Sequence, residues 1–301
     1  MSPRGPFALE HSQGSAHAAD VLALRAEAFA APACADTARE WDALDALSHH
    51  VLARDGEGRL LGAGRLSPDQ RIARLGVLPA WRGRGIGRAL LGALLQEAHQ
   101  RDWPQLRLQL PAPSGAVSGL PFFVPAGFLP LRGSTDLQRR LDGPMAVEDA
   151  AAATLAAAAV IAQSRRELRI YSRALDPGLL DARAVQAALR AFATLPHDKQ
   201  VRVLVQEAGN PQLFDAPLLR LAQRLPSVFQ FRAVCDPVDA SYAAAYLVGD
   251  AQSYYFRSTG SRYDDGETWL EGAARARQLR AHFEQIWERS RLWHEHRALG
   301  L

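Results

Sequence analysis

The sequence has little of what would indicate a secreted or membrane protein. It contains only two cysteines, Cys34 and Cys235, in 301 residues, which argues against a disulfide-stabilised secreted fold. It has no run of about 18 apolar residues, so we expect no transmembrane helix and no membrane partner. The N-terminus lacks a basic segment followed by an apolar one, so we expect no signal peptide. Together these absences predict a cytoplasmic protein.

Lysine is also scarce, because Lys199 is the only lysine among 35 basic residues. Basic and acidic residues are balanced along the chain, with 16 and 14 in residues 1–142 and 19 and 18 in residues 143–301. No polycationic segment results, so nucleic-acid binding is not expected. One local exception is the stretch from Arg71 to Arg88, which holds five arginines and no acidic residue.

Apolar periodicity and turn residues predict an α/β protein of two domains. A break at Asp142-Gly143-Pro144 separates a first domain, residues 20–142, from a second, residues 143–301. Residues 1–19 are polar and small, so we expect a flexible N-terminus. The first domain should hold a mixed sheet with flanking helices. Its helical segments are expected over 21–29, 84–101 and 120–124, and its strands over 49–54, 59–66, 71–78, 106–110, 128–132 and 137–141.

The second domain shows helical and strand patterns that alternate along the chain. This alternation predicts an α/β domain with a largely parallel sheet. Its helices are expected over 147–164, 182–195, 213–224 and 269–293, and its strands over 168–172, 201–206, 228–233, 244–248 and 253–257.

A glycine-rich turn between a strand and a helix is the clearest functional feature. Gly83, Gly85 and Gly87 follow a strand that ends at Pro79. Amides at a helix N-terminus have no intrahelical partner, and glycine lets several of them point at one anion. The spacing differs from the dinucleotide fingerprint G-x-G-x-x-G, and the Gly-Lys-Ser/Thr of a P-loop is absent. We therefore predict a site for phosphate or pyrophosphate.

The segment Arg82-Gly83-Arg84-Gly85-Ile86-Gly87 resembles the acyl-CoA-binding motif Q/R-x-x-G-x-G/A of the GNAT superfamily of N-acetyltransferases. The resemblance implies a GNAT fold over about residues 20–141. It implies acetyl transfer from the cosubstrate acetyl-CoA to a primary amine of a small molecule or a protein. It further implies that the preceding strand pairs with the pantetheine arm and that the loop amides bind the pyrophosphate. The implied cofactor-binding residues are Leu75, Gly76, Val77, Arg82, Gly83, Arg84, Gly85, Ile86 and Gly87.

Three further segments are similar to GNAT sequences. Asp42 and Asp45 precede Ser48-His49-His50-Val51-Leu52-Ala53, which resembles the acid-rich entry into the second strand of one bacterial branch. Gly64-Arg65-Leu66 resembles the next strand, and Phe122-Phe123-Val124-Pro125-Ala126-Gly127-Phe128 resembles the motif Phe-Tyr-x-x-x-Gly-Phe. We favour an acidic surface beside a helix for the two aspartates over an amine-binding pair.

The residues that GNAT enzymes commonly use for proton transfer are missing. Phe123 replaces a tyrosine that donates a proton, which a phenyl ring cannot do. The strand over 71–78 offers no glutamate base, although Asp69 lies just outside it, and Pro111-Ala112-Pro113 replaces a polar residue. The catalytic residues therefore stay unassigned. Direct attack with water or Asp69 carrying the amine proton is one option; a weak or inactive acyl-CoA-binding regulatory protein is the alternative.

His49 and His50 lie on a strand that can line the acceptor site. We favour a different arrangement, in which one of the two histidines is hydrogen-bonded in the core and the other is solvated.

The second domain resembles part of a phospholipase D-like fold in Leu168–Ser172, Val201–Val205 and Phe283–Glu288. The active motif of that family, His-x-Lys-x-x-x-x-Asp, aligns with residues 243–250, where only Asp250 matches because Ala243 and Ala245 replace the histidine and lysine. Attack on a phosphodiester needs the imidazole. We therefore expect no phosphodiesterase activity.

Two other features of the second domain leave alternatives open. The segments Tyr254–Arg257 and Arg262–Asp265 form an anion or peptide pocket or, as we favour, a buried strand and a solvated turn. The last helix carries Trp287 and Trp293 and packs on its own domain or on a second protomer, so a homodimer is an option. His294 and His296 are two residues apart and do not share a helix face, so we expect no metal site.

Overall fold

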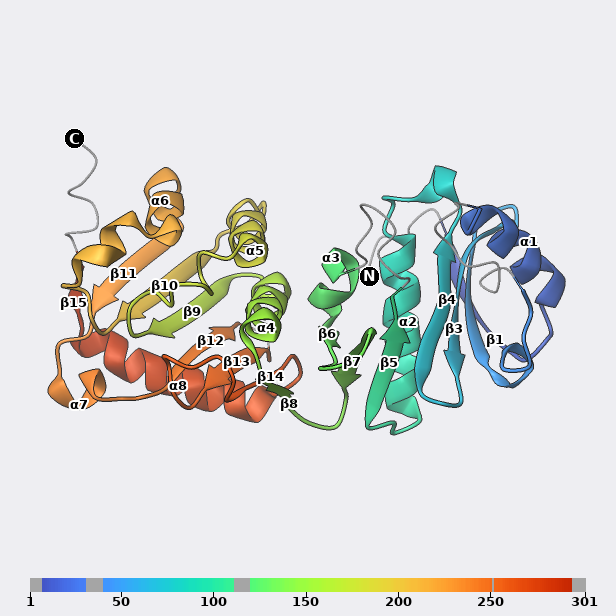
Figure 1. Cartoon of the computed structure of the whole chain (residues 1–301). Helices are drawn as coiled ribbons and strands as arrows, with labels where there is room; N and C mark the ends of the chain where they lie inside the picture. Colours follow the sequence, from blue (N-terminus) through green and yellow to red (C-terminus); the bar gives the residue numbers. More distant parts are fainter. Residues whose placement is uncertain (1–6, 31–39, 111–119, 251, 294–301) are drawn as a thin grey trace. The chain divides into compact units, whose positions relative to one another are not determined.

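The computed structural model describes residues 7–30, 40–110, 120–250 and 252–293. The chain forms two compact units, each built on one β-sheet (Figure 1). The first unit contains residues 1–119 and 130–142, and the second contains residues 120–129 and 143–301. Residues 120–129, which we predicted in the first domain, therefore belong to the second unit. Val124 and Leu129 lie in its core because they pack with its apolar side chains.

The first unit has a seven-stranded sheet in the order β1-β2-β3-β4-β5-β7-β6. Neighbouring strands for which the register is defined are antiparallel, except that β4 and β5 are parallel. The strands are β1 (Ala8–Gln13), β2 (His49–Arg54), β3 (Leu60–Ser67), β4 (Arg71–Val77), β5 (Gln105–Gln109), β6 (Leu129–Pro130) and β7 (Asp136–Arg140). In β6, Pro130 belongs to the first unit, whereas Leu129 is the last residue of the segment grouped with the second.

The N-terminal strand β1 was not predicted, and the expectation of a flexible segment over 1–19 is wrong for it. All six residues of β1 pair with β2, from Ala8 opposite Arg54 to Gln13 opposite His49. Helix α1 (Ala18–Ala28) also begins inside that range. The polar side chains of β1 hid the strand, because an edge strand has one solvated face and a weak apolar pattern.

Two helices cover opposite faces of the first sheet. On one face, Val21 and Leu24 of α1 pack with Ala63 of β3. On the other face lies α2 (Ile86–Gln100), which approaches β3 so closely that a Cβ on Gly64 would lie 2.8 Å from Leu94 Cδ1. The absence of a side chain at Gly64 therefore sets the distance between α2 and the sheet. A short helix, α3 (Leu120–Phe123), follows later in the chain and belongs to the second unit.

The second unit has an eight-stranded sheet in the order β15-β11-β10-β9-β12-β13-β14-β8. Only β9, β10 and β11 are parallel to one another, and the remaining pairs are antiparallel. The expected largely parallel sheet is therefore mixed, since short connections such as the one between β12 and β13 permit only antiparallel pairing. The strands are β8 (Met145–Val147), β9 (Glu167–Ser172), β10 (Gln200–Val205), β11 (Phe229–Ala233), β12 (Ala245–Gly249), β13 (Tyr254–Arg257), β14 (Gly266–Trp269) and β15 (Arg291–Leu292).

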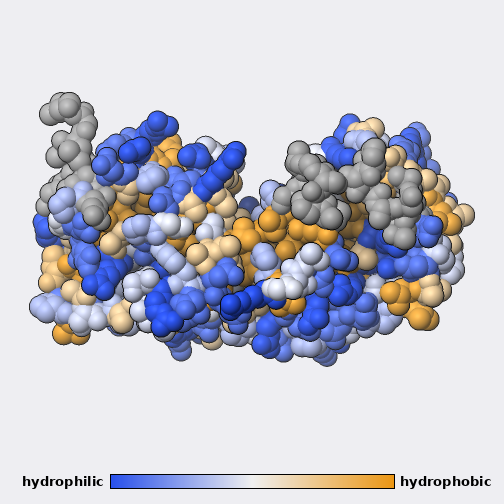
Figure 2. Space-filling model, in the orientation of Figure 1, coloured by the Kyte–Doolittle hydropathy of each residue, from blue (hydrophilic) through white to orange (hydrophobic). Residues whose placement is uncertain are grey.

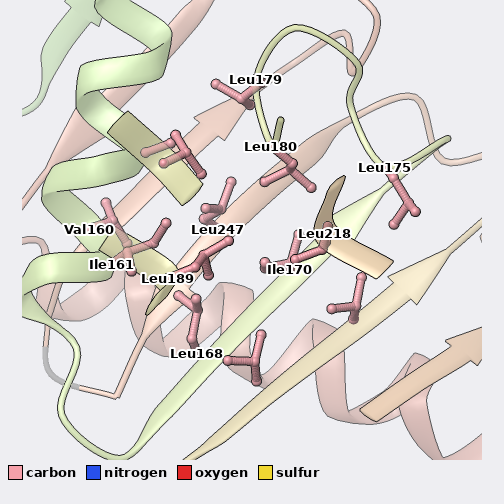
Figure 3. Packing of buried hydrophobic residues seen from close by; sticks show 14 of the residues in the cluster. Val160, Ile161, Leu168, Ile170, Leu175, Leu179, Leu180, Leu189, Leu218 and Leu247 are labelled. Atoms are coloured by element: carbon pink, nitrogen blue, oxygen red, sulfur yellow. The ribbon is translucent and has the colours of Figure 1, made fainter. Parts of the chain in front are cut away.

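Alternate residues of the central strands fill two apolar layers in this unit. Leu168 and Ile170 of β9 lie in one cluster with α4, α5 and α6 (Figure 3). Tyr171, the next residue after Ile170, points to the other face and lies in a second cluster with Phe283 of α8. The sheet is thus covered on both faces, as its apolar strands require. The helices are α4 (Ala150–Gln163), α5 (Arg183–Ala193), α6 (Pro217–Arg224), α7 (Pro237–Ala240) and α8 (Ala273–Arg289).

Hydrophilic residues occupy much of the visible surface of both units (Figure 2). The most apolar helix, α4, has 14 residues, whereas a membrane span needs about 20. Among the described residues, no helix combines the length and apolar character needed to cross a bilayer.

Candidate functional site

Strand β4 leaves one backbone edge without a strand partner. It pairs with β5 only at Arg71 and Arg107, where the Arg107 amide donates to the Gln70 carbonyl over 3.0 Å. Its other edge pairs with β3 as far as Val77. In the described part of the chain, the ladder on the β5 side does not continue beyond Arg71. Because backbone N–H and C=O groups need partners, this edge suits an extended ligand that carries amide groups.

A β-bulge interrupts β4 in its pairing with β3. Ala63 pairs with Gly76, but the next pair along the ladder is Arg65 with Ala73. The extra residue is accommodated at Arg74, which has a φ of 54°, a conformation that few residues other than glycine adopt. Bulges bend a strand and are common beside active sites, so β4 bends in its middle, where it pairs with β3.

The glycine-rich loop follows β4 and opens α2. Gly83 and Gly85 have φ values of 77° and 85°, and a Cβ on either would meet no atom within 4 Å. Gly85 is the N-cap of α2. Among the described residues, no acceptor receives the amides from Gly83 to Arg88, whereas the Ala89 amide donates to Gly85. Amides at the positive end of the helix dipole can donate hydrogen bonds to an anion.

The arginines of this stretch are used in different ways. The Arg82 guanidinium donates to the carbonyls that end β4 and α1, over 3.1 and 2.9 Å, so it fixes the loop in place. Arg84 lies over the Trp81 ring, 4.7 Å from its centroid. Arg84 and Arg88 are exposed and pair with no acidic residue in the described part of the chain. They remain as the cations beside the loop.

Asp42 and Asp45 belong to a network of ion pairs, so the prediction of an acidic surface is wrong for the fully buried Asp45. Asp45 accepts two hydrogen bonds from Arg25, over 2.6 and 2.9 Å, and lies 3.0 Å from Arg65. Asp42 accepts from Arg65 over 2.6 Å and from Arg74 over 3.1 Å. Both carboxylates are therefore engaged by arginines.

The pKa of each aspartate follows from these contacts. Burial alone would raise the pKa of Asp45, but the hydrogen bonds from Arg25 and from the Asp42 amide hold it well below its usual range. Burial also opposes ionisation of Asp42, yet the bonds from Arg65 and Arg74 lower its pKa. Such carboxylates stay charged and are poor general bases near neutral pH.

Both histidines of β2 are buried, which corrects the expectation that one of them is solvated. His50 Nε2 lies 2.9 Å from the Asp45 carbonyl, and its ring stacks on Trp41. His49 Nε2 lies 2.9 Å from His11 Nδ1. Burial lowers the pKa of both His49 and His50 and so favours the neutral form of both rings, which already have partners.

Asp69 and the positions where the proton-transfer residues of GNAT enzymes are missing lie in three different parts of the chain. Asp69 lies in the turn before β4, at the opposite end of that strand from the glycine loop, and is 3.4 Å from Arg71. Phe123 belongs to the second unit, where its ring packs edge-on against Phe128. Pro111-Ala112-Pro113 lies outside the described residues. Asp69 therefore does not lie beside the glycine loop.

Sequence reasoning missed the arginines that hold the two aspartates. Arg25 is 20 residues from Asp45, and Arg65 and Arg74 are 23 and 32 residues from Asp42. No local spacing signals such pairs. The one available hint was Arg25 itself, a charged residue on the apolar stripe of α1 beside Val21, since a charge on such a stripe needs a buried partner.

In the second unit, Asp250, which we aligned with the last residue of the phospholipase D-like motif, has a structural role. Asp250 accepts hydrogen bonds from the amides of Arg165 and Arg166, over 2.8 and 2.7 Å. The Ala243 carbonyl accepts a hydrogen bond from the Gly260 amide, and Ala245 is buried in β12. No imidazole or amine stands at the two alanine positions.

The segment around β13 matches the arrangement we favoured. Tyr254, Tyr255 and Arg257 are buried, and Arg257 pairs with buried Asp176 over 2.5 Å. The following turn is solvated and contains an exposed ion pair between Arg262 and Asp264. The prediction of a buried strand and a solvated turn is confirmed.

The last helix ends earlier than expected, at Arg289. Trp287 and Trp293 are both buried, and Trp293 donates its amide to the Phe231 carbonyl of β11. His294 and His296 lie outside the described residues.

Comparison with protein families divides the chain in a similar way. Residues 148–299 match the model described as Domain of unknown function (DUF7931). Residues 18–111 match the model described as Acetyltransferase (GNAT) family. The first unit therefore carries a GNAT fold, and this confirms the coarse fold that the glycine motif predicted for it. No curated protein matches the chain.

Solved structures with GNAT folds resemble less than half of the chain. An acyl-CoA N-acyltransferase from Pseudomonas aeruginosa is 22% identical, with a TM-score of 0.35, over 44% of this chain and 99% of its own. The GNAT enzyme YhbS from Escherichia coli, in complex with CoA, is 20% identical, with a TM-score of 0.35, over 46% and 84%. A structure with a different description, that of the archaeal chromatin protein TrmBL2, matches more of the chain. It is 10% identical, with a TM-score of 0.38, over 68% of this chain and 65% of its own. These low scores carry no argument about substrate.

Proposed function

We propose that this chain, which belongs to the DUF7931 family and carries a GNAT domain ahead of that region, transfers an acetyl group from acetyl-CoA to a primary amine. The observation that supports this most is the unpaired edge of β4, which leads directly into a loop of unsatisfied amides at the start of α2. An extended amide chain that ends in a pyrophosphate matches both features, and acetyl-CoA has that construction.

The residues of the first unit fit this cosubstrate. The β4 edge around Leu75, Gly76 and Val77 would hold the pantetheine amides. The amides from Gly83 to Gly87 would hold the pyrophosphate, with Arg84 and Arg88 adding positive charge. The Arg82 side chain would hold the loop in position through its bonds to two backbone carbonyls and would not contact the phosphates itself.

The proposed transfer uses no dedicated acid or base. Acetyl-CoA supplies a thioester that is already activated towards amines. Asp42, Asp45 and His50 are held by other groups of the first unit. The neutral amine would attack the thioester carbonyl, and the nitrogen, positively charged after attack, would lose a proton to water or to Asp69. The C–S bond would then break, and CoA would leave as its thiolate. The rate should therefore rise with pH as more of the amine becomes neutral.

The activity test is release of CoA thiol from acetyl-CoA in the presence of polyamines, amino acids and lysine peptides, followed by mass spectrometry of the amine. Thiol release that depends on one amine, together with an acetylated product, is the expected result. Release at the same rate without any amine, or none with any amine despite cosubstrate binding, would contradict the proposal and favour a regulatory role.

We also propose that the second unit is a phospholipase D-like domain without its catalytic motif. The support is the parallel run of β9, β10 and β11, together with Asp250 at the end of the aligned motif. Bis-p-nitrophenyl phosphate should not be hydrolysed, because Ala243 and Ala245 offer no nucleophile or acid. Nitrophenol release that co-purifies with the protein through two columns would contradict this prediction.

A further inference from the structure

Three side chains from separate elements of the first unit converge on the α2 face of the sheet. They are His11 on β1, His49 on β2 and Glu97 on α2. One donor atom of each lies within 4.8 Å of the donor atoms of the other two. His11 Nδ1 and His49 Nε2 are 2.9 Å apart, and His49 Nδ1 is 3.7 Å from Glu97 Oε1.

The strand register explains why the two histidines meet. Gln13 is directly opposite His49, and His11 is opposite Val51. Residues two apart on a strand share a face, so His11 is the diagonal neighbour of His49, within reach of its ring. Glu97 then reaches the same point from the helix above.

We propose that His11, His49 and Glu97 bind a zinc ion, which the sequence did not lead us to expect. Two imidazoles and one carboxylate form a common protein donor set for zinc. Donor atoms around a tetrahedral zinc ion are about 3.3 Å apart, given metal–ligand distances of about 2.0–2.1 Å. The histidine nitrogens need to separate by only a few tenths of an ångström, and Glu97 needs to move inward.

The surroundings provide for the remaining requirements of a metal site. His11 is exposed, so an ion can enter and a water can take the fourth position. The Gln13 side-chain amide lies 3.1 Å from His49 Nδ1. With its carbonyl oxygen turned towards the ring, it can accept the Nδ1–H that remains when Nε2 binds the metal, as partners of metal-binding histidines do. Arg101 contacts Glu97 on Oε1, over 2.7 and 2.8 Å, which leaves Oε2 for the metal.

A metal at this place would join the N-terminal strand to the rest of the unit. Since zinc would bind the folded chain through three elements, it should also stabilise that fold. The proposal is independent of acetyl transfer, because its measurements need no substrate.

The test is calorimetric titration of the chelator-treated full chain with ZnCl₂, with thermal unfolding followed in parallel. We expect one zinc per chain at micromolar affinity or tighter and a higher melting temperature with zinc. His11→Ala and Glu97→Gln should each weaken binding by at least about tenfold. His99→Ala, an exposed histidine on the same helix, is the matched control and should bind as the wild type does.

His11→Ala removes an exposed side chain, so it should fold even if changes at buried His49 do not. Cobalt substitution adds an independent readout, because a His/His/Glu site gives no sulfur-to-cobalt charge-transfer band. Absence of zinc binding, unchanged affinity in His11→Ala, or a sulfur band from a cysteine would each overturn the proposal.

Discussion

Gly85→Glu is expected to weaken acetyl-CoA binding by at least about 100-fold, which corresponds to about 2.7 kcal/mol. Gly85 has a φ of 85° and no neighbouring atom where a Cβ would lie, so a side chain there strains the backbone by roughly 1–2 kcal/mol. The new carboxylate would also stand beside the amides that we propose bind the pyrophosphate. Its repulsion of phosphate adds to the strain. Isothermal titration calorimetry measures the change.

The matched control is Gly92→Glu, the same substitution further along α2. Gly92 is exposed, lies within the helix and has open space around it, so glutamate should improve helix propensity there. Its affinity for acetyl-CoA should stay within about twofold of the wild type. Circular dichroism should show both variants folded. Equal affinity of the two variants would show that the loop does not hold the cosubstrate.

Asp45→Asn is expected to lower the free energy of unfolding by about 3–5 kcal/mol, because it leaves the buried Arg25 guanidinium without its anion. Arg25 and Asp45 have relative exposures of 1% and 0%, so water cannot replace the lost charge. The variant should unfold at a lower urea concentration at pH 7 than the wild type.

The pH dependence gives a second readout of the same pair. The pKa of Asp45 is lower in the folded chain than its ordinary value of 3.8. Its contribution to stability is therefore complete above that ordinary value and is lost as the pH falls further, when the folded carboxylate also takes up a proton. The stability difference between wild type and Asp45→Asn should shrink below pH 3.8.

Asp20→Asn serves as the control for an ion pair in solvent. Asp20 bonds to Arg54 over 2.9 Å, but its side chain is 52% exposed, so its loss should cost less than about 1 kcal/mol. If Asp20→Asn and Asp45→Asn destabilise the chain equally, the buried network does not have the role that its geometry indicates.

Local features of the fold were predictable from the sequence. The strand β2 matches its predicted range, and α2 begins two residues after the predicted start, at Ile86. Their apolar periods are clear, and glycine and proline mark their ends. The glycine turn before α2 was predictable for the same reason, since a positive φ at Gly83 and Gly85 depends on the residue type itself.

Features that depend on distant partners were not predictable. The short strands β8, β14 and β15 carry weak patterns, and each is defined by its pairing with a neighbouring strand. The ion network around Asp45 and the convergence of His11 with Glu97 join residues that are far apart in sequence. The place of residues 120–129 in the second unit likewise depends on packing against α4, which no local pattern reveals.

Calorimetric titration of acetyl-CoA into the purified full chain tests the central proposal first. We expect one site per chain with micromolar affinity and competition by CoA. Fragments without phosphate groups, such as pantetheine, should bind more weakly, because they lack the pyrophosphate that the loop would hold. No heat of binding, or equal affinity for pantetheine and acetyl-CoA, would mean that the glycine loop is only a turn between β4 and α2.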